Sequence, residues 1–155
     1  MRRLLIRPGA IGDVIVSLPA LDVAAQQAAY SEVWVPGVTV PLVTFANRVR
    51  SIAGTGLDLL ELGLAPSALV DRLRGFDSIY SWYGTARPDF RAAVSDLPVR
   101  FFPALPGDSG QHAVDYYLTQ VGAEKGDRPR FPVDRRKGAF VAVHPFSGSA
   151  RKNWP

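Results

Sequence analysis

The sequence contains no cysteine, and its only histidines are His112 and His144. A chain without thiols forms no disulfide framework and no thiolate metal site, and two histidines leave little for a histidine-based metal centre. With 47% hydrophobic and 21% charged residues, the composition is that of a globular domain with its own core. We therefore expect a cytoplasmic protein with no resident metal or cofactor.

Long apolar runs are missing as well. The chain opens with Arg2 and Arg3, but the apolar stretch that follows is soon interrupted by Arg7, Pro8 and Asp13. A signal peptide needs a longer uninterrupted apolar region, and a membrane-spanning helix needs about 18 apolar residues or more. The sequence therefore predicts neither of these segments.

Basic residues are concentrated at one end of a chain whose net charge is +4. Beyond residue 124, two acidic side chains are outnumbered by these basic ones: Lys125, Arg128, Arg130, Arg135, Arg136, Lys137, Arg151 and Lys152. Such a segment indicates nucleic acid, an anionic membrane surface or a phosphorylated ligand as a partner. Nucleic acid is disfavoured because no recognised binding motif is present and a predicted strand divides the basic residues. The simplest interpretation of residues 128–137 is a solvated basic linker.

Short apolar runs alternate with helical patterns along the chain. The patterns predict strands at 3–7, 32–35, 50–52, 58–62, 78–82, 99–102 and 140–144, and helices at 13–29, 41–47, 66–74, 88–95 and 112–121. This alternation is typical of an α/β fold, with a Rossmann-like, mostly parallel sheet that has helices on both faces. Residues 122–138, rich in charge and proline, are the best candidate for a linker.

The stretch RPGAIGDVIVSLPAL, residues 7–21, joins the first predicted strand to the first predicted helix through two glycines. A dinucleotide-binding fingerprint has the pattern G-x-G-x-x-G, but Arg7 takes the place of its first glycine. The second strand also ends in Val35, Pro36 and Gly37, where an acidic residue would hold a ribose. Both departures disfavour a Rossmann oxidoreductase.

Asp13 has two interpretations. It is a first-turn or capping residue, because a carboxylate there accepts hydrogen bonds from free backbone N–H groups and suits the helix dipole. Alternatively, the turn presents it at the carboxyl edge of the sheet, where it accepts a proton from a substrate hydroxyl. The residues themselves leave both open.

The stretch HPFSGSARKNWP, residues 144–155, follows the last predicted strand. Ser147 and Gly148 lie in a small turn before a predicted helix start, where backbone N–H groups bind anions, and Lys152 adds a full positive charge. This pattern is typical of a phosphate site, and its alternative is a solvated Ser/Gly loop.

Together, IRPGAIGDVIVSLPAL and VAVHPFSGSARKNWP resemble the ADP-heptose:lipopolysaccharide heptosyltransferases, glycosyltransferase family 9. The two motifs occur in the family's order, and HAVDYYLTQVG is similar to the His-led helix between them. The resemblance implies a GT-B enzyme, in which two Rossmann-type domains face each other, with the acceptor on the first and the ADP-sugar on the second. Residues 1–137 would be the acceptor-side domain, and residues 138–155 the start of a truncated donor-binding domain.

The resemblance also implies roles for particular residues. The family's catalytic base corresponds to Asp13, and its diphosphate-binding lysine corresponds to Lys152, with Ser147 and Gly148 in the preceding turn. Asp13 would deprotonate an acceptor hydroxyl as it attacks the anomeric carbon, with inversion, while Lys152 and turn amides stabilise the departing diphosphate. No metal is required if fixed cations stabilise that charge.

Acceptor binding is assigned on weaker grounds to Gly12, Trp82, Arg87 and Arg91. The aromatic ring and the arginines would stack on and clamp an anionic glycolipid, but packing and surface roles explain them equally well.

The chain is thus interpreted as the N-terminal half of an inverting glycosyltransferase. It would move heptose, or a related sugar, from an ADP-sugar to a lipopolysaccharide-type acceptor, and it is expected to be inactive alone. The alternative is a non-catalytic binding domain for an anionic sugar or nucleotide. The expected location is the cytoplasm, with a peripheral contact at the inner face of the cytoplasmic membrane left open, as is the oligomeric state.

Overall fold

A computed structural model describes residues 1–107, 110–124, 128–131, 138–139, 141 and 143. Its centre is a five-stranded sheet in the order β3-β2-β1-β4-β5, and every pair of neighbours is parallel. The strands are β1 (Arg2–Ile6), β2 (Tyr30–Val35), β3 (Arg48–Ser51), β4 (Ser78–Ser81) and β5 (Val99–Phe101). The prediction of a parallel sheet is confirmed.

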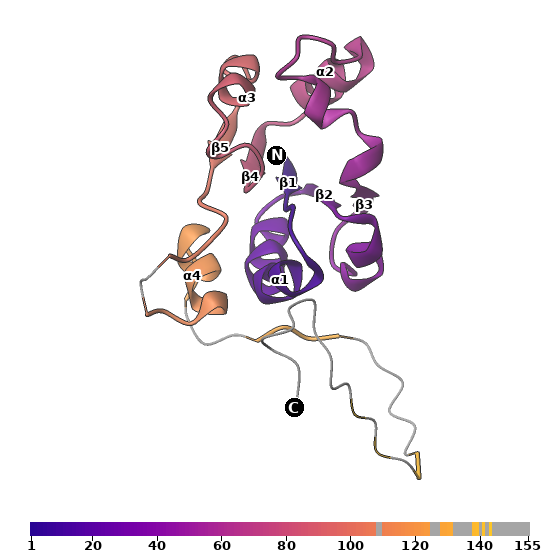
Figure 1. The fold of residues 1–155 in the computed structure, drawn as a ribbon, viewed down its shortest axis with the longest axis vertical. Helices are drawn as coiled ribbons and strands as arrows, with labels where there is room; N and C mark the ends of the chain where they lie inside the picture. Colours follow the sequence, from indigo (N-terminus) through magenta and orange to yellow (C-terminus); the bar gives the residue numbers. More distant parts are fainter. Residues whose placement is uncertain (108–109, 125–127, 132–137, 140, 142, 144–155) are drawn as a thin grey trace.

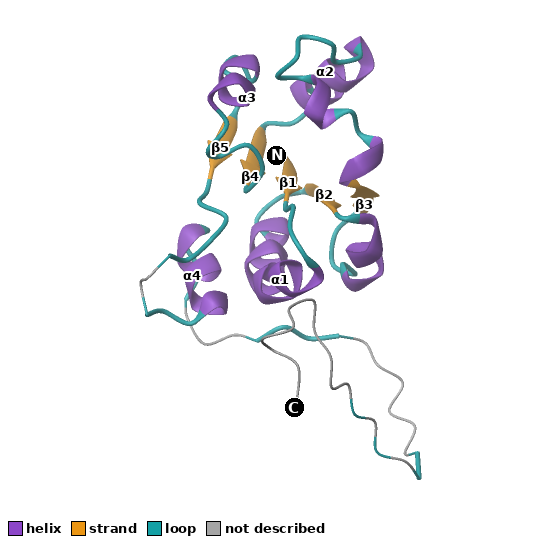
Figure 2. Ribbon diagram, viewed as in Figure 1, coloured by secondary structure: helices purple, strands orange, loops and turns teal. Residues whose placement is uncertain are grey.

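Helices connect the strands and cover both faces of the sheet (Figure 1). The α-helices are α1 (Ile11–Gln26), α2 (Ser67–Arg74), α3 (Pro88–Ala93) and α4 (Ala113–Gln120), and the short 3₁₀ helices are η1 (Gly37–Leu42), η2 (Ile52–Gly54) and η3 (Leu57–Leu59). In Figure 2, α1 and α4 lie on one side of the strands, and α2 and α3 lie on the other. Among the described residues, no helix is long and apolar enough to cross a membrane.

The alternation of side chains along β1 separates two hydrophobic cores. Leu5 packs into the core on the side of α1 and α4, whereas Leu4 and Ile6 pack into the core on the side of α2 and α3. All three side chains are almost completely buried, as expected for the central strand of a sheet that is covered on both faces. The core therefore fixes β1 firmly, together with the turn that follows it.

Two predicted elements are wrong. Residues 58–62 are not a strand, because η3 begins after Gly56, which has φ +73°, and local hydrogen bonds such as Leu62 N–H to the Leu59 carbonyl continue the tight turns. The helix predicted at 41–47 is also absent, and the 3₁₀ helix η1 occupies residues 37–42 instead. In both places a short apolar run suggested a regular element, although its side chains are not all buried: Leu62, for example, is 64% exposed.

Strands are added first on one side of β1 and later on its other side. The chain builds β2 and β3 on one side of β1 and then returns to place β4 and β5 on the other. The connection after β1 leads into α1 on one face, and the connection after β4 leads into α3 on the opposite face. Open parallel sheets bind ligands at the carboxyl edge beside such a switch point. The candidate site therefore lies where the connections after β1 and β4 meet this edge.

Candidate active site

Asp13 lies in the first turn of α1, directly after the carboxyl end of β1, as predicted. The helix begins after Ala10, and the Ala10 N–H donates a 2.9 Å hydrogen bond to Oδ2 of Asp13. This bond satisfies one of the free N–H groups at the helix start. Within the part of the chain that the structure describes, no group hydrogen-bonds Oδ1, and the side chain is only partly buried. Asp13 thus has a structural role and still retains a carboxylate oxygen that can accept a proton.

Gly9 allows the backbone to approach Asp13 closely. Its φ of +119° is a conformation that L side chains rarely adopt, and an added Cβ would lie 2.9 Å from both Cβ and Oδ2 of Asp13. Gly12 differs, because it has helical geometry and an added Cβ would meet no atom within 4 Å. The exposed surface at Gly12 leaves open space beside Asp13.

Arg7 is buried beneath this turn, with 1% of its surface exposed. Its guanidinium donates to the carbonyl oxygens of Pro8 and Asp13, at 2.7 and 3.1 Å, and to the Ser17 hydroxyl at 3.1 Å. A fourth bond, at 2.9 Å, reaches the hydroxyl of Tyr117 on α4. The cation that replaces the first glycine of a dinucleotide fingerprint therefore holds the Asp13 turn to the neighbouring helix.

Tyr117 extends this network to the connection between β5 and α4. Its hydroxyl donates a 2.6 Å hydrogen bond to the Ala104 carbonyl, and the Arg7 guanidinium lies 4.8 Å from its ring centre. Burial lowers the pKa of Arg7 and raises the pKa of the Tyr117 hydroxyl, because both charged forms lose solvation. Arginine remains a cation despite this shift, so the network keeps a buried positive charge beneath the turn.

Arg87 follows β4 on the other side of the switch point. It immediately precedes α3, donates a 2.6 Å hydrogen bond to the Tyr83 hydroxyl and forms an ion pair with Glu61. Arg91, one turn further along α3, lies with its guanidinium 4.5 Å from the ring centre of Phe101. The structure thus places Arg87 at the same edge as Asp13, already engaged with an acidic side chain, whereas Arg91 stacks on the sheet edge.

Trp82 is 2% exposed, so its ring belongs to the core. It stacks on Phe102, with ring centres 5.0 Å apart, and its indole N–H donates to Gln120 at 2.6 Å. A ring in this position offers no open face to a ligand. Its effect is to support the carboxyl ends of β4 and β5 from below.

His112 begins α4, in agreement with the His-led helix of the sequence. Its Nδ1 accepts a 3.3 Å hydrogen bond from the Val114 N–H and thereby caps the helix. α4 packs closely on α1, and Tyr117 projects from it to Arg7. His112 therefore acts structurally, through the helix that supports the Asp13 turn.

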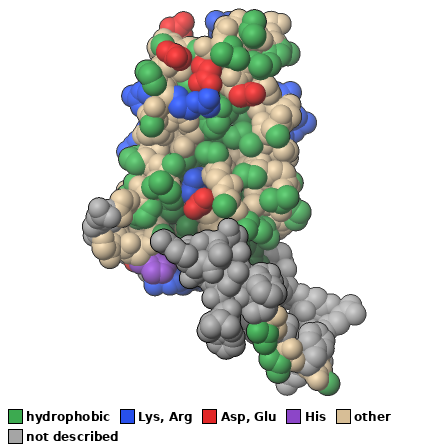
Figure 3. Space-filling view, viewed as in Figure 1, with side chains coloured by type: hydrophobic (Ala, Val, Ile, Leu, Met, Phe, Trp, Pro, Cys, Tyr) green, Lys and Arg blue, Asp and Glu red, His purple; other side chains and the backbone are tan. Residues whose placement is uncertain are grey.

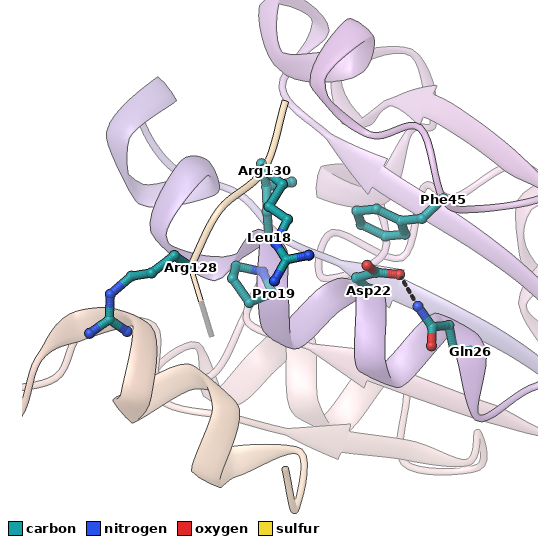
Figure 4. A pocket seen from close by; sticks show the side chains of 7 residues that line it. All are labelled: Leu18, Pro19, Asp22, Gln26, Phe45, Arg128 and Arg130. Atoms are coloured by element: carbon teal, nitrogen blue, oxygen red, sulfur yellow. Dashed lines mark hydrogen bonds between the residues drawn. The ribbon is translucent and has the colours of Figure 1, made fainter. Parts of the chain in front are cut away.

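Residues 128–131, part of the predicted linker, lie against α1. Arg128 and Arg130 line a cavity of about 260 Å³ beside that helix (Figure 4). In Figure 4, the Arg130 side chain points between Pro19 and Asp22, while Arg128 points away from them. Arg128 instead approaches Asp115 of α4, with 3.7 Å between the charged atoms. This part of the predicted linker is thus in contact with both helices that support the site.

The predicted donor-site residues, Ser147, Gly148 and Lys152, lie outside the described residues, as does most of the predicted strand at 140–144. On the face shown in Figure 3, apolar side chains occupy much of the middle, and acidic and basic side chains gather towards the end that carries α2 and α3.

The strand order 3-2-1-4-5, with helices on both faces, defines a Rossmann-like α/β domain. No protein-family model matches the sequence, and no curated protein matches it significantly. A solved structure, E. coli heptosyltransferase WaaC with ADP-2-deoxy-2-fluoro heptose, is similar, with a TM-score of 0.56 and 16% sequence identity. The match covers 100% of this chain but only 62% of the WaaC chain. The likeness to heptosyltransferases is thus confirmed for the fold.

Proposed function

We propose that this chain is the acceptor-side domain of an inverting glycosyltransferase that moves heptose, or a related sugar, from an ADP-sugar to an anionic glycolipid of the lipopolysaccharide type. The proposal depends mainly on the location of Asp13. Its carboxylate stands after the central strand, beside the switch point, on a fold shared with a heptosyltransferase. A peripheral contact with the inner face of the cytoplasmic membrane would bring such a domain to its acceptor.

The chemistry assigned to Asp13 is that of a general base. Its carboxylate takes the proton of an acceptor hydroxyl while that oxygen forms a bond to the anomeric carbon of the donor. The bond from the anomeric carbon to the diphosphate breaks on the opposite face, so the configuration inverts and ADP leaves with the electron pair. Lys152 and the N–H groups of the turn at Ser147 and Gly148 stabilise the negative charge on the departing diphosphate.

The turn around Asp13 is suited to this role because it is held rigidly. Arg7 fixes the Asp13 carbonyl from below, and the Ala10 N–H fixes one carboxylate oxygen, so the second oxygen has a defined direction. Positioning of this kind contributes to the rate by keeping the reacting groups in line. Gly12 leaves room for the acceptor hydroxyl to approach.

Arg87 is the acceptor contact that the geometry favours. Its side chain is 46% exposed and pairs with Glu61, so an anionic group of the acceptor would replace or share that carboxylate. Arg91 lies on the same helix and adds positive charge nearby. Trp82 supports this region from the core and makes no contact in the proposed complex.

The test compares Asp13→Asn with Asp22→Asn in an enzyme completed by a donor-binding domain. Asparagine keeps an oxygen that accepts the Ala10 N–H, so stability should change by about 1 kcal/mol or less, while turnover should fall about 10² to 10⁴-fold. Asp22 lies on the same helix and, in the described part of the chain, accepts a hydrogen bond from Gln26, so its variant controls for the lost charge and should retain activity. An active Asp13→Asn enzyme would refute the base.

Because the chain matches only 62% of the WaaC chain, we expect the 155 residues alone not to transfer sugar, the adenine and ribose contacts being assigned to a donor-binding domain. Release of ADP from ADP-heptose in the presence of acceptor measures this directly. Turnover by the isolated chain at an ordinary enzymatic rate would contradict the proposal that a separate domain binds the donor. If the completed enzyme is also inactive while the chain binds the acceptor, the alternative of a binding domain is favoured.

A further inference from the structure

A hollow lies between β3 and α2, on the face of the sheet opposite α1. Its volume is about 260 Å³, and its lining includes Arg50, Gly54 and Arg72. Arg50 is the penultimate residue of β3, so the hollow opens beside the end of that strand. We propose that this hollow binds an oxyanion, a phosphate or carboxylate group, through the guanidinium groups of Arg50 and Arg72.

Arg72 projects from the last turn of α2, whose apolar residues Leu69 and Leu73 are buried in the core. The side chain of Arg72 is exposed and makes no hydrogen bond or ion pair with any residue that the structure describes. Arg74, two residues further along, does have an acidic neighbour, since it lies 4.0 Å from Asp71. Arg72 is therefore an unpaired cation at the hollow, and its guanidinium donors are available.

The positive charge of Arg50 is only partly offset by neighbouring residues. Its Nε lies 2.7 Å from Oε1 of Glu32, but this buried nitrogen makes no hydrogen bond. Glu32 is itself almost completely buried and accepts a 2.8 Å hydrogen bond from the indole N–H of Trp34. The Arg50 side chain is 26% exposed, and no described group bonds its two terminal nitrogens. The two terminal nitrogens of Arg50 are therefore available to donate hydrogen bonds to a ligand.

The charged residues that line the hollow are both arginines, Arg50 and Arg72, and the carboxylate of Glu32 pairs with only the first of them. Guanidinium groups match the oxygens of phosphate and carboxylate groups in geometry as well as charge. An oxyanion between Arg50 and Arg72 would accept hydrogen bonds from their terminal nitrogens. The volume accommodates such a group with part of a larger molecule attached.

This site is separate from the one around Asp13. β3 is two strands away from β1, which is roughly 10 Å across the sheet, and the hollow lies on the other face from α1. The proposal therefore stands without glycosyl transfer, and its failure would leave the Asp13 assay unaffected.

The test is a titration of the isotopically labelled 155-residue chain with inorganic phosphate, followed by NMR at low and constant ionic strength. Backbone amide signals near the hollow, such as that of Gly54, should shift and saturate. Arg72→Gln should weaken phosphate binding about tenfold, the effect of losing one charge-assisted hydrogen bond. Arg74→Gln removes the same charge from the same helix outside the hollow and should leave the affinity unchanged.

Arg50→Gln tests the second arginine. Because Glu32 loses its partner in this variant, a thermal unfolding curve is recorded to check that the protein still folds. A folded Arg50→Gln protein should also bind phosphate about tenfold more weakly. A parallel titration with acetate distinguishes a phosphate site from a carboxylate site. Shifts that do not saturate with either anion, or an equal loss in the Arg74→Gln control, would overturn the proposal.

Discussion

Replacing Tyr117 with phenylalanine removes one oxygen from the network beneath the Asp13 turn and keeps the ring. Two hydrogen bonds are lost, one from the Arg7 guanidinium at 2.9 Å and one to the Ala104 carbonyl at 2.6 Å. A bond to a charged group contributes about 1.5–3 kcal/mol and a neutral one about 1 kcal/mol, while the buried hydroxyl no longer has to be desolvated. We expect Tyr117→Phe to lower the free energy of unfolding by about 2–3 kcal/mol.

Urea unfolding measures this loss, and a thermal scan should show a Tm lower by roughly 10 °C for a domain of this size. Tyr116→Phe is the matched control, because that hydroxyl donates to the Leu105 carbonyl in an exposed position where water replaces it. The control should cost less than about 1 kcal/mol. If the two variants lose the same stability, Tyr117 is not a structural partner of Arg7, and the reasoning fails. A double-mutant cycle with Arg7→Met should give less than the sum of the single losses, because the two residues share a bond.

Further predictions concern the same turn and its pH dependence. Gly9→Ala should destabilise the fold by about 1–3 kcal/mol, because it combines a φ of +119° with a 2.9 Å clash against Asp13, and urea unfolding would contradict this if stability were unchanged. Gly12→Ala, at an unobstructed helical position, should instead stabilise the fold by about 0.5–1 kcal/mol in the same assay. Burial raises the pKa of Tyr117 above its ordinary value of 10.0, so the unfolded chain loses this proton first and stability falls as pH rises past that value. Unfolding curves at pH 8 and pH 11 should show a smaller alkaline loss for Tyr117→Phe than for the unsubstituted chain, and an equal loss would contradict the assignment.

The contrast between Gly9 and Gly12 shows how much of the site can be predicted from a motif. The sequence places both glycines between a strand and a helix, and that spacing was enough to predict a turn that presents Asp13 at the carboxyl edge. It did not show that Gly9 alone is sterically required, because this depends on the distance of its backbone from the Asp13 side chain. Nor did it show that Asp13 both accepts the Ala10 N–H and keeps a second oxygen available.

Local patterns by themselves determined the α/β class, because the spacing of apolar residues reflects the side of a strand or helix that is buried. The apolar runs at β1 and β2 and the helical spacing in α1 are signals of this kind. Where the pattern was short, as at residues 58–62, glycines and local hydrogen bonds produced a 3₁₀ helix instead of a strand.

Only the tertiary structure decided what the arginines do. Arg7 meets Tyr117 across 110 positions of sequence, Arg87 meets Glu61 across 26, and Arg50 and Arg72 border one hollow from different elements. No local pattern encodes such pairs, because they arise when the strand order brings distant connections to one edge of the sheet. The sequence determined which segments carry charge, while long-range packing determined which cations are buried as supports and which remain available to a ligand.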